Sequence, residues 1–158
     1  MRFVALLVSL ALAAPAAASP PPPPAEFVMK SAGILAADVD AASIDRWSAL
    51  FADDVVASVN GTLLVRGKAD WVALARARIG KVRRRLAGYT MASMPSEGTS
   101  GELLVVDEVD PVPPADPHFI ADPRWSTRAT LYGFGADGLI HTVRILEAKG
   151  FFQRPVAR

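Results

Sequence analysis

An Asn-Gly dipeptide between two β-rich segments constrains the fold of this 158-residue chain more than any other local feature. Residues 55–59 and 62–65 are rich in valine and leucine, and only Asn60 and Gly61 separate them. A two-residue hairpin turn needs positive φ at both turn positions, which asparagine and glycine tolerate best. The sequence therefore predicts a β-hairpin over residues 55–65.

The segments around this hairpin follow a simple order of predicted helices and strands. Helices are predicted over residues 25–37 and over residues 68–82. Between them, Asp40 or Ser43 caps another predicted helix, in which Ile44, Trp47, Leu50 and Phe51 recur at helical spacing. Strands are predicted at residues 86–94, 102–109, 125–134 and 139–147. Because these strands do not alternate with helices, the predicted class is α+β.

The N-terminal segment has the pattern of a secretory signal peptide. A basic start at Arg2 precedes an apolar run over residues 3–14, and three alanines end at Ala18. The run is shorter than the roughly 20 residues that span a bilayer, so we expect cleavage after Ala18 rather than an uncleaved anchor. This predicts a periplasmic or secreted bacterial protein that does not remain in the membrane.

The prediction divides the chain into four parts. Residues 1–18 are the signal peptide, residues 19–25 a stiff proline-rich spacer, residues 26–152 the folded domain and residues 153–158 a C-terminal tail. The loop over residues 110–124 holds five prolines, which disfavour a central strand.

Charge and composition exclude several classes of function. The chain carries 17 basic and 16 acidic residues, so loss of Arg2 leaves a net charge near zero and no general attraction to nucleic acid. A basic cluster over residues 76–85 and an acidic stretch over residues 97–122 are better explained by an internal dipole or a dimer contact. Without cysteine, and with His118 and His141 far apart, the sequence predicts neither a metal site nor a cofactor.

Four short motifs occur in a recognisable order, namely Leu50–Val56, Gly67–Trp71, Thr130–Phe134 and Ala136–Ile140. They resemble the nuclear transport factor 2-like superfamily, which includes ketosteroid isomerase-like and SnoaL-like proteins. The resemblance implies a cone-shaped, curved antiparallel sheet wrapped around three N-terminal helices, and a homodimer formed through the sheet. Members include enzymes and binding domains, so the fold does not select a function.

The residues that serve steroid isomerisation in this superfamily are absent. Alignment on the Ala-Asp-Asp motif places the family's aspartate base at or beside Val59, and a second family aspartate falls on Thr130. The tyrosine of the first helix has no counterpart in residues 25–37. Isomerisation through that base and its oxyanion donors is therefore not expected.

Strand alternation predicts which side chains line a pocket. Arg128, Thr130 and Tyr132 share one face of their strand, and His141, Val143, Ile145 and Glu147 share the matching face of the next. The opposite face, with Leu131 and Leu146, is more apolar and is the alternative core. The predicted ligand-binding residues are Trp47, Val59, Trp125, Thr130, Tyr132, Val143 and Ile145.

These observations favour an exported domain that binds a small organic molecule. One alternative is a SnoaL-like lyase, isomerase or hydrolase in which His141, Glu147 and Arg128 are catalytic, since imidazole titrates near neutral pH and the guanidinium stabilises negative charge. The non-catalytic interpretation is that His141 is a half-exposed strand residue and that Arg128 and Glu147 form a structural ion pair. A second alternative is an interaction or dimerisation module.

Overall fold

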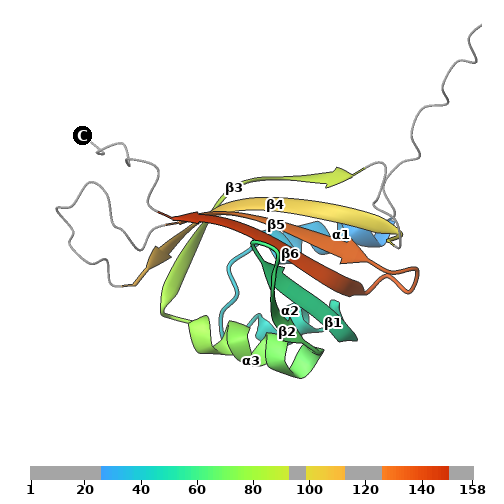
Figure 1. The fold of residues 1–158 in the computed structure, drawn as a ribbon, viewed down its shortest axis with the longest axis horizontal. Helices are drawn as coiled ribbons and strands as arrows, with labels where there is room; N and C mark the ends of the chain where they lie inside the picture. The colour runs from blue at the N-terminus through green and yellow to red at the C-terminus, as the bar shows by residue number, and fades with distance from the viewer. Residues whose placement is uncertain (1–25, 93–98, 113–125, 150–158) are drawn as a thin grey trace, which may run out of the picture.

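The computed structural model describes residues 26–92, 99–112 and 126–149, in which three helices lie under a curved six-stranded sheet (Figure 1). The helices are α1 (Glu26–Ala36), α2 (Ile44–Ser48) and α3 (Lys68–Arg78). The strands are β1 (Phe51–Val59), β2 (Thr62–Arg66), β3 (Val82–Ala92), β4 (Gly101–Pro111), β5 (Ser126–Phe134) and β6 (Ile140–Lys149). The predicted α+β class is confirmed.

The sheet is open and has the order β2-β1-β6-β5-β4-β3. All neighbouring strands are antiparallel except β1 and β6, which run parallel, so the sheet is mixed rather than wholly antiparallel. The two halves of the chain meet at this parallel pair, where Val59 lies opposite Ile145. Helix α1 packs under β3 and β4, whereas α3 packs under β1 and β2.

The predicted hairpin is present, and its turn has the backbone that the dipeptide favours. Asn60 has φ of 48° and Gly61 has φ of 80°, both in the left-handed region. The Asn60 side chain also reaches β6, where Oδ1 accepts a hydrogen bond from the backbone nitrogen of Glu147 at 2.9 Å and Nδ2 donates to its carbonyl at 3.1 Å. This turn therefore fixes the end of β1 against β6.

Aromatic rings from four elements form the centre of the core. The Trp47 ring lies 4.6 Å from Phe51 and 5.9 Å from Trp71, and Phe51 contacts Tyr132 at 6.4 Å between centroids. Phe51 is fully buried. The cluster holds α2 and α3 beneath β5 and so sets the space between the helices and the sheet.

Two predicted helices end earlier than their sequence patterns indicate. Phe51 was expected on the second helix, but α2 ends at Ser48 and Phe51 begins β1, because the backbone of Ile140 donates to the Leu50 carbonyl at 2.8 Å. Helix α3 ends at Arg78, since Gly80 has φ of 73° and turns the chain into β3. Both boundaries depend on tertiary contacts rather than local propensity.

Several sequence predictions fall outside the described residues. They are the signal peptide, the proline-rich spacer, the C-terminal tail and residues 113–124 of the loop predicted over residues 110–124. Among the described residues, no helix combines the length and apolar character needed to cross a membrane.

Candidate functional site

A cavity of about 340 Å³ lies between the helices and the inner face of the sheet. Its inner walls come from α2, α3 and strands β3 to β6, and its exposed rim comes from the α1–α2 loop and the segment that joins α3 to β3. The lining residues that the argument uses are Trp47, Trp71, Ala75, Arg78, Arg84, Asp107, Arg128, Thr130, Tyr132 and Ile145. This volume falls in the range of cavities that hold small molecules.

One side of the cavity is formed by large apolar side chains. Trp47 and Trp71 approach from the helices, and Tyr132 and Ile145 approach from the sheet, each of them buried. Such walls favour an apolar ligand body because they remove its surface from water.

The cavity is also lined by an ion pair between Arg84 of β3 and the buried Asp107 of β4. Asp107 is 1 % exposed, and its Oδ2 accepts hydrogen bonds from Arg84 Nε at 2.8 Å and Nη2 at 2.5 Å. Arg84 also donates to the carbonyls of Leu35 and Ala37 at the end of α1. The pair therefore joins the helix to the sheet beside the cavity.

A row of charged side chains crosses the inner face of the sheet. Asp107, Arg128 and Glu147 are cross-strand neighbours on β4, β5 and β6. Arg128 Nη2 lies 3.7 Å from Glu147 Oε1, which is an ion pair but too long for a hydrogen bond. Glu147 Oε1 instead accepts a hydrogen bond from Ser126 Oγ at 2.8 Å. Arg128 is thus only partly neutralised.

Three buried polar atoms around the cavity have no hydrogen-bond partner within the described ranges. They are Trp71 Nε1, Asp107 Oδ1 and Arg128 Nε. All three residues line the cavity. Buried polar groups are normally paired, and an unpaired one destabilises the protein. A ligand with polar groups is one way to satisfy them.

The electrostatics of Tyr132 and Arg78 show how closely these charges surround the cavity. Burial raises the pKa of the Tyr132 phenol, and the nearby charges of Arg84, Asp107 and Arg128 act on it in opposite directions. Loss of solvent, and then the positive charge of Arg128, lower the pKa of Arg78, while Glu147 opposes that change. Two guanidinium groups, from Arg78 of α3 and Arg128 of β5, thus line the same cavity.

The structure places the predicted ligand-binding residues in three different settings. Trp47, Thr130, Tyr132 and Ile145 line the cavity. Val59 and Val143 pack in or against the hydrophobic core instead, and Trp125 lies outside the described residues. The polar face of β5 and β6 thus points inward.

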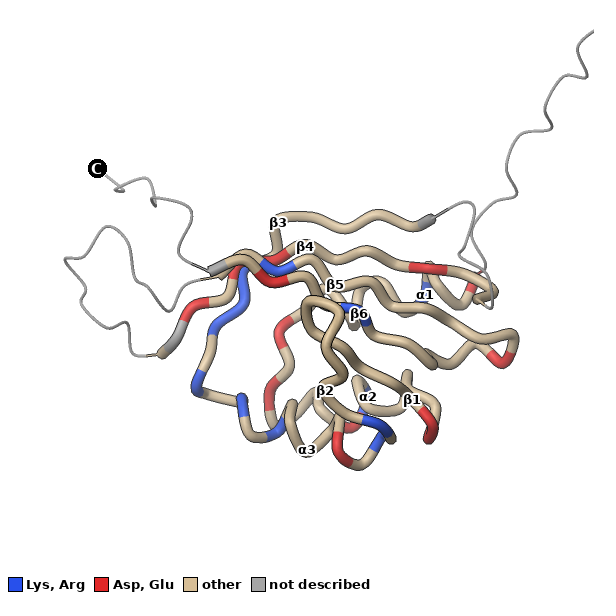
Figure 2. The backbone as a smooth tube through the Cα atoms, in the orientation of Figure 1, with Lys and Arg blue, Asp and Glu red and all other residues tan. Residues whose placement is uncertain are grey.

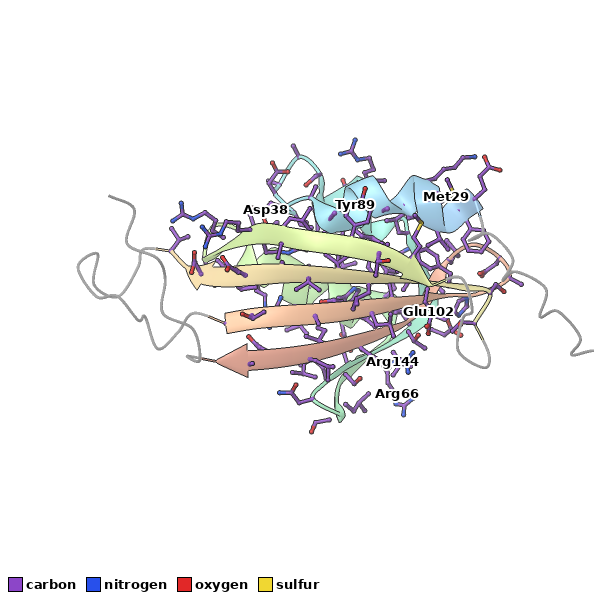
Figure 3. The ribbon with its side chains drawn as sticks, turned by 90° about the horizontal axis from the view of Figure 1, so that it is seen from above. Met29, Asp38, Arg66, Tyr89, Glu102 and Arg144 are labelled. Atoms are coloured by element: carbon purple, nitrogen blue, oxygen red, sulfur yellow. The ribbon has the colours of Figure 1, made fainter. Side chains whose placement is uncertain are left out.

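The alternate residues of β5 and β6, those predicted not to line the pocket, lie on the outer face of the sheet. Leu146 is 65 % exposed, and Arg144 on the same face donates to Glu102 Oε1 at 2.7 Å (Figure 3). Arg144 therefore has a partner across β5 and does not need the cavity.

The three predicted catalytic residues do not converge on the cavity. Arg128 lines it, and Glu147 contacts Arg128, but His141 lies near the β5–β6 turn. His141 and Glu147 are six residues apart on one strand, which separates them by roughly 20 Å. His141 Nδ1 lies 2.8 Å from Asp54 Oδ1, and its Nε2 lies 3.1 Å from Asp137 Oδ2. The histidine therefore joins β1 to the β5–β6 turn at the surface.

The basic cluster and the acidic stretch meet within the chain. Figure 2 shows Lys and Arg along the segment from α3 into β3, beside the Asp and Glu residues of β4. Arg84 pairs with Asp107, and Arg85 pairs with Glu108. Cross-strand ion pairs between β3 and β4 therefore account for part of this charge pattern.

Sequence reasoning did not identify Asp107 and Arg84 as pocket residues. A signal was present, because Asp107 alternates with Leu103, Val105 and Val109, all of which are buried. An acidic residue on an otherwise inward apolar face needs a buried partner. Strand alternation therefore predicts the inward-facing residues of β4 as it does those of β5. Within the described ranges, no group of three or more side chains able to hold a metal ion is present.

Comparisons with known proteins give a fold rather than a close relative. No protein-family model and no curated protein matches the sequence. A candidate polyketide cyclase from Silicibacter sp. is similar with a TM-score of 0.56 and 15 % identity over 79 % of this chain and 91 % of that chain. An LEH-like epoxide hydrolase from M. tuberculosis is similar with a TM-score of 0.55 and 14 % identity over 77 % of this chain and 79 % of that one.

A third solved structure has the same arrangement. A candidate ketosteroid isomerase from Kribbella flavida has a TM-score of 0.53 and 13 % identity, covering 84 % of this chain and 86 % of its own. At these identities the likeness concerns the fold. The chain has the nuclear transport factor 2-like fold, and the structural resemblance predicted from its four motifs is confirmed.

Proposed function

We propose that this domain is exported and binds a small organic molecule between its helices and its sheet. The observation that carries the proposal is the cavity of about 340 Å³, which combines buried apolar walls with unpaired buried polar atoms. Apolar walls supply affinity, and a few fixed polar groups supply orientation and specificity. The arrangement suits a ligand with an apolar body and a polar end.

Tryptophan fluorescence offers a direct test of binding. Two of the three tryptophans of the chain, Trp47 and Trp71, line the cavity, so a bound molecule changes their emission. We expect a panel of small aromatic and aliphatic compounds to include members that produce a saturable change. The absence of a saturable change across the panel contradicts the proposal.

A substitution that fills the cavity locates the site of binding. Ala75 lines the cavity from α3, whereas Ala77, two residues later, is exposed and does not. Ala75→Trp is expected to abolish binding of the compounds found above, and Ala77→Trp is expected to leave their affinity unchanged. Because each variant adds a tryptophan, binding is followed by calorimetry. Equal affinities of the two variants place the binding site elsewhere.

Export rests on the N-terminal sequence and has its own test. We propose that the chain is cut after Ala18, so that the mature protein begins at Ser19. The intact mass of the protein from the periplasmic fraction or culture medium of a bacterial host measures the cleavage site. A full-length chain retained in the cytoplasm contradicts this part of the proposal. Ala18→Glu, which replaces the small residue at the cleavage site, is the control for processing.

Acid–base catalysis is the second candidate function, and Asp107 is the residue that favours it. Its Oδ2 is held by Arg84, while its Oδ1 is buried without a partner beside the cavity. A carboxylate fixed in this way is placed to accept a proton from a substrate, and Arg128 is placed to stabilise negative charge. Hydrolase, isomerase and lyase chemistry remain the classes to assay.

The test of catalysis separates turnover from binding. Asp107→Asn keeps the shape of the side chain and removes its basicity. If the domain is an enzyme, this variant binds substrate with altered affinity but loses turnover by about 100-fold or more, the usual contribution of a general base. Unchanged turnover in a folded Asp107→Asn protein excludes Asp107 as the base.

A further inference from the structure

We infer that the ligand of this cavity is an organic carboxylate, and that Arg78 and Arg128 form its anion-binding subsite. This inference rests on the proposed binding function and adds the chemical class of the ligand. The inference follows from a comparison of the charged side chains that line the cavity, some of which are neutralised by partners within the protein and some of which are not.

The acidic residues of the cavity are each engaged within the protein. Asp107 pairs with Arg84. At the rim, Asp38 Oδ1 accepts a hydrogen bond from the backbone nitrogen of Arg84 at 3.2 Å. Asp40 Oδ1 accepts hydrogen bonds from the backbone nitrogens of Ala42 and Ser43 before α2. None of these carboxylates pairs with Arg78 or Arg128.

Three arginines besides Arg84 line the cavity, namely Arg78, Arg83 and Arg128. Arg78 and Arg83 are exposed to solvent, whereas the Arg128 side chain is largely buried and poorly compensated. Arg128 is 14 % exposed, its Nε has no hydrogen-bond partner among the described residues, and its nearest carboxylate, Glu147, stays at 3.7 Å. Arg78 lines the same cavity from the end of α3, where partial burial and then the positive charge of Arg128 lower its pKa. Two positive charges that face one cavity are both stabilised by an anion between them, because the two attractions to the anion offset the repulsion between the cations.

Trp71 adds a neutral donor to the same cavity. Its indole Nε1 is buried and unpaired within the described part of the chain. Arginine forks match the planar geometry of a carboxylate, and an indole N–H donates but cannot accept. The unpaired donors thus outnumber the single unpaired acceptor, Asp107 Oδ1, whose charge Arg84 already neutralises. The apolar walls accommodate the hydrocarbon part of the same molecule.

The experiment compares ligands that differ only in charge. Calorimetry measures binding of 3-phenylpropanoate and of its neutral amide to the folded domain, with a series from benzoate to octanoate and the matching amides. We expect the best acid to bind at least about tenfold more tightly than its amide, since a hydrogen bond to a charged group contributes this much or more.

Substitutions then assign the preference to the two arginines. Arg78→Gln and Arg128→Gln are each expected to weaken binding of the acid about tenfold and to leave binding of the amide nearly unchanged. The matched control is Arg76→Gln, on the same helix, because Arg76 is exposed, pairs with Asp45 and does not line the cavity. Arg78 makes no side-chain ion pair with a described residue, so Arg78→Gln tests the inference without loss of a structural contact.

Each outcome has a distinct meaning. Equal binding of acids and amides, or an unchanged preference in folded Arg78→Gln and Arg128→Gln proteins, overturns the carboxylate inference and leaves cavity binding intact. Failure of every acid and every neutral compound to bind overturns both the inference and the proposed function.

Discussion

Asp107 and Arg128 are direct cross-strand neighbours on β4 and β5, yet the Asp107 carboxylate is held by Arg84 of the next strand. Asp107 Oδ1 and Arg128 Nε each remain without a hydrogen-bond partner among the described residues. Opposite charges on facing strands usually pair. Here the pairing is displaced by one strand, which leaves a cationic side chain at the cavity.

Breaking the Arg84–Asp107 pair is expected to destabilise the fold far more than breaking the neighbouring Arg85–Glu108 pair. Arg84→Ala leaves Asp107, which is 1 % exposed, as an uncompensated buried charge, so we expect a loss of about 3–5 kcal/mol in the free energy of unfolding. Arg85→Ala, one residue later, removes an ion pair with Glu108 in which the side chains are 61 % and 30 % exposed. That loss is expected to be below about 1 kcal/mol. Urea denaturation measures both, and similar losses contradict the prediction.

The Asn60 side chain is expected to contribute to stability beyond its role in the turn. Asn60→Gly tolerates positive φ but loses both side-chain hydrogen bonds to the Glu147 backbone. At about 1 kcal/mol for each bond, the free energy of unfolding falls by about 1–2 kcal/mol. Asn60→Asp keeps the acceptor and loses the donor, so it tests the Nδ2 bond alone. A thermal melt of Asn60→Gly that matches wild type would show that neither bond matters.

The local sequence pattern correctly predicted the elements that depend on only a few neighbouring residues. The Asn60-Gly61 turn, the strands and the inward face of β5 follow from turn chemistry and alternation. The α2–β1 boundary did not follow, because Phe51 fits a helical stripe by spacing and becomes a strand residue only when β6 pairs beside it. Tertiary pairing there outweighs helical propensity.

The candidate site was predictable only in part. Trp47, Thr130, Tyr132, Ile145 and Arg128 were identified by family position or alternation, and they line the cavity. Asp107 and Arg84 were treated as members of opposite charge clusters, because a single sequence does not show which strands become neighbours. Once β3 and β4 are paired, Leu86 lies opposite Asp107 and Arg84 lies opposite Val109. Arg84 and Asp107 are then diagonal neighbours on the two strands, which a single sequence does not reveal.

The outer face of the sheet is expected to pair with a second copy of the chain. Leu131 lies opposite Leu104 on that face, and Leu146 beside them is 65 % exposed. We propose a homodimer, because pairing removes this apolar surface from water. Sedimentation velocity is expected to show a dimer for wild type and a monomer for Leu146→Glu. Leu63→Glu, at an exposed leucine of β2, is the control that keeps the dimer, and a monomeric wild type contradicts the proposal.

His141 is expected to make the stability of the domain depend on pH. Burial disfavours its charge, but hydrogen bonds and charges from Asp137 and Asp54 outweigh that effect and raise its pKa above the ordinary 6.5. Because the folded state holds the proton more tightly than the unfolded state, the stabilisation is complete below the unfolded pKa. It is lost as pH rises from about 6.5 through the raised folded pKa.

His141→Gln isolates this contribution from the other titrating groups. Chemical denaturation at pH 5.5 and at pH 8.5 gives the free energy of unfolding of both proteins, and the difference between them is expected to be larger at pH 5.5. The backbone nitrogen of Leu139 and the His141 side chain both bond Asp137 and lower its pKa, so the acidic partner stays ionised at pH 5.5. His118→Gln is the control for the second histidine. A difference that is equal at both pH values, or larger at pH 8.5, would show that His141 does not gain its proton affinity from these two aspartates.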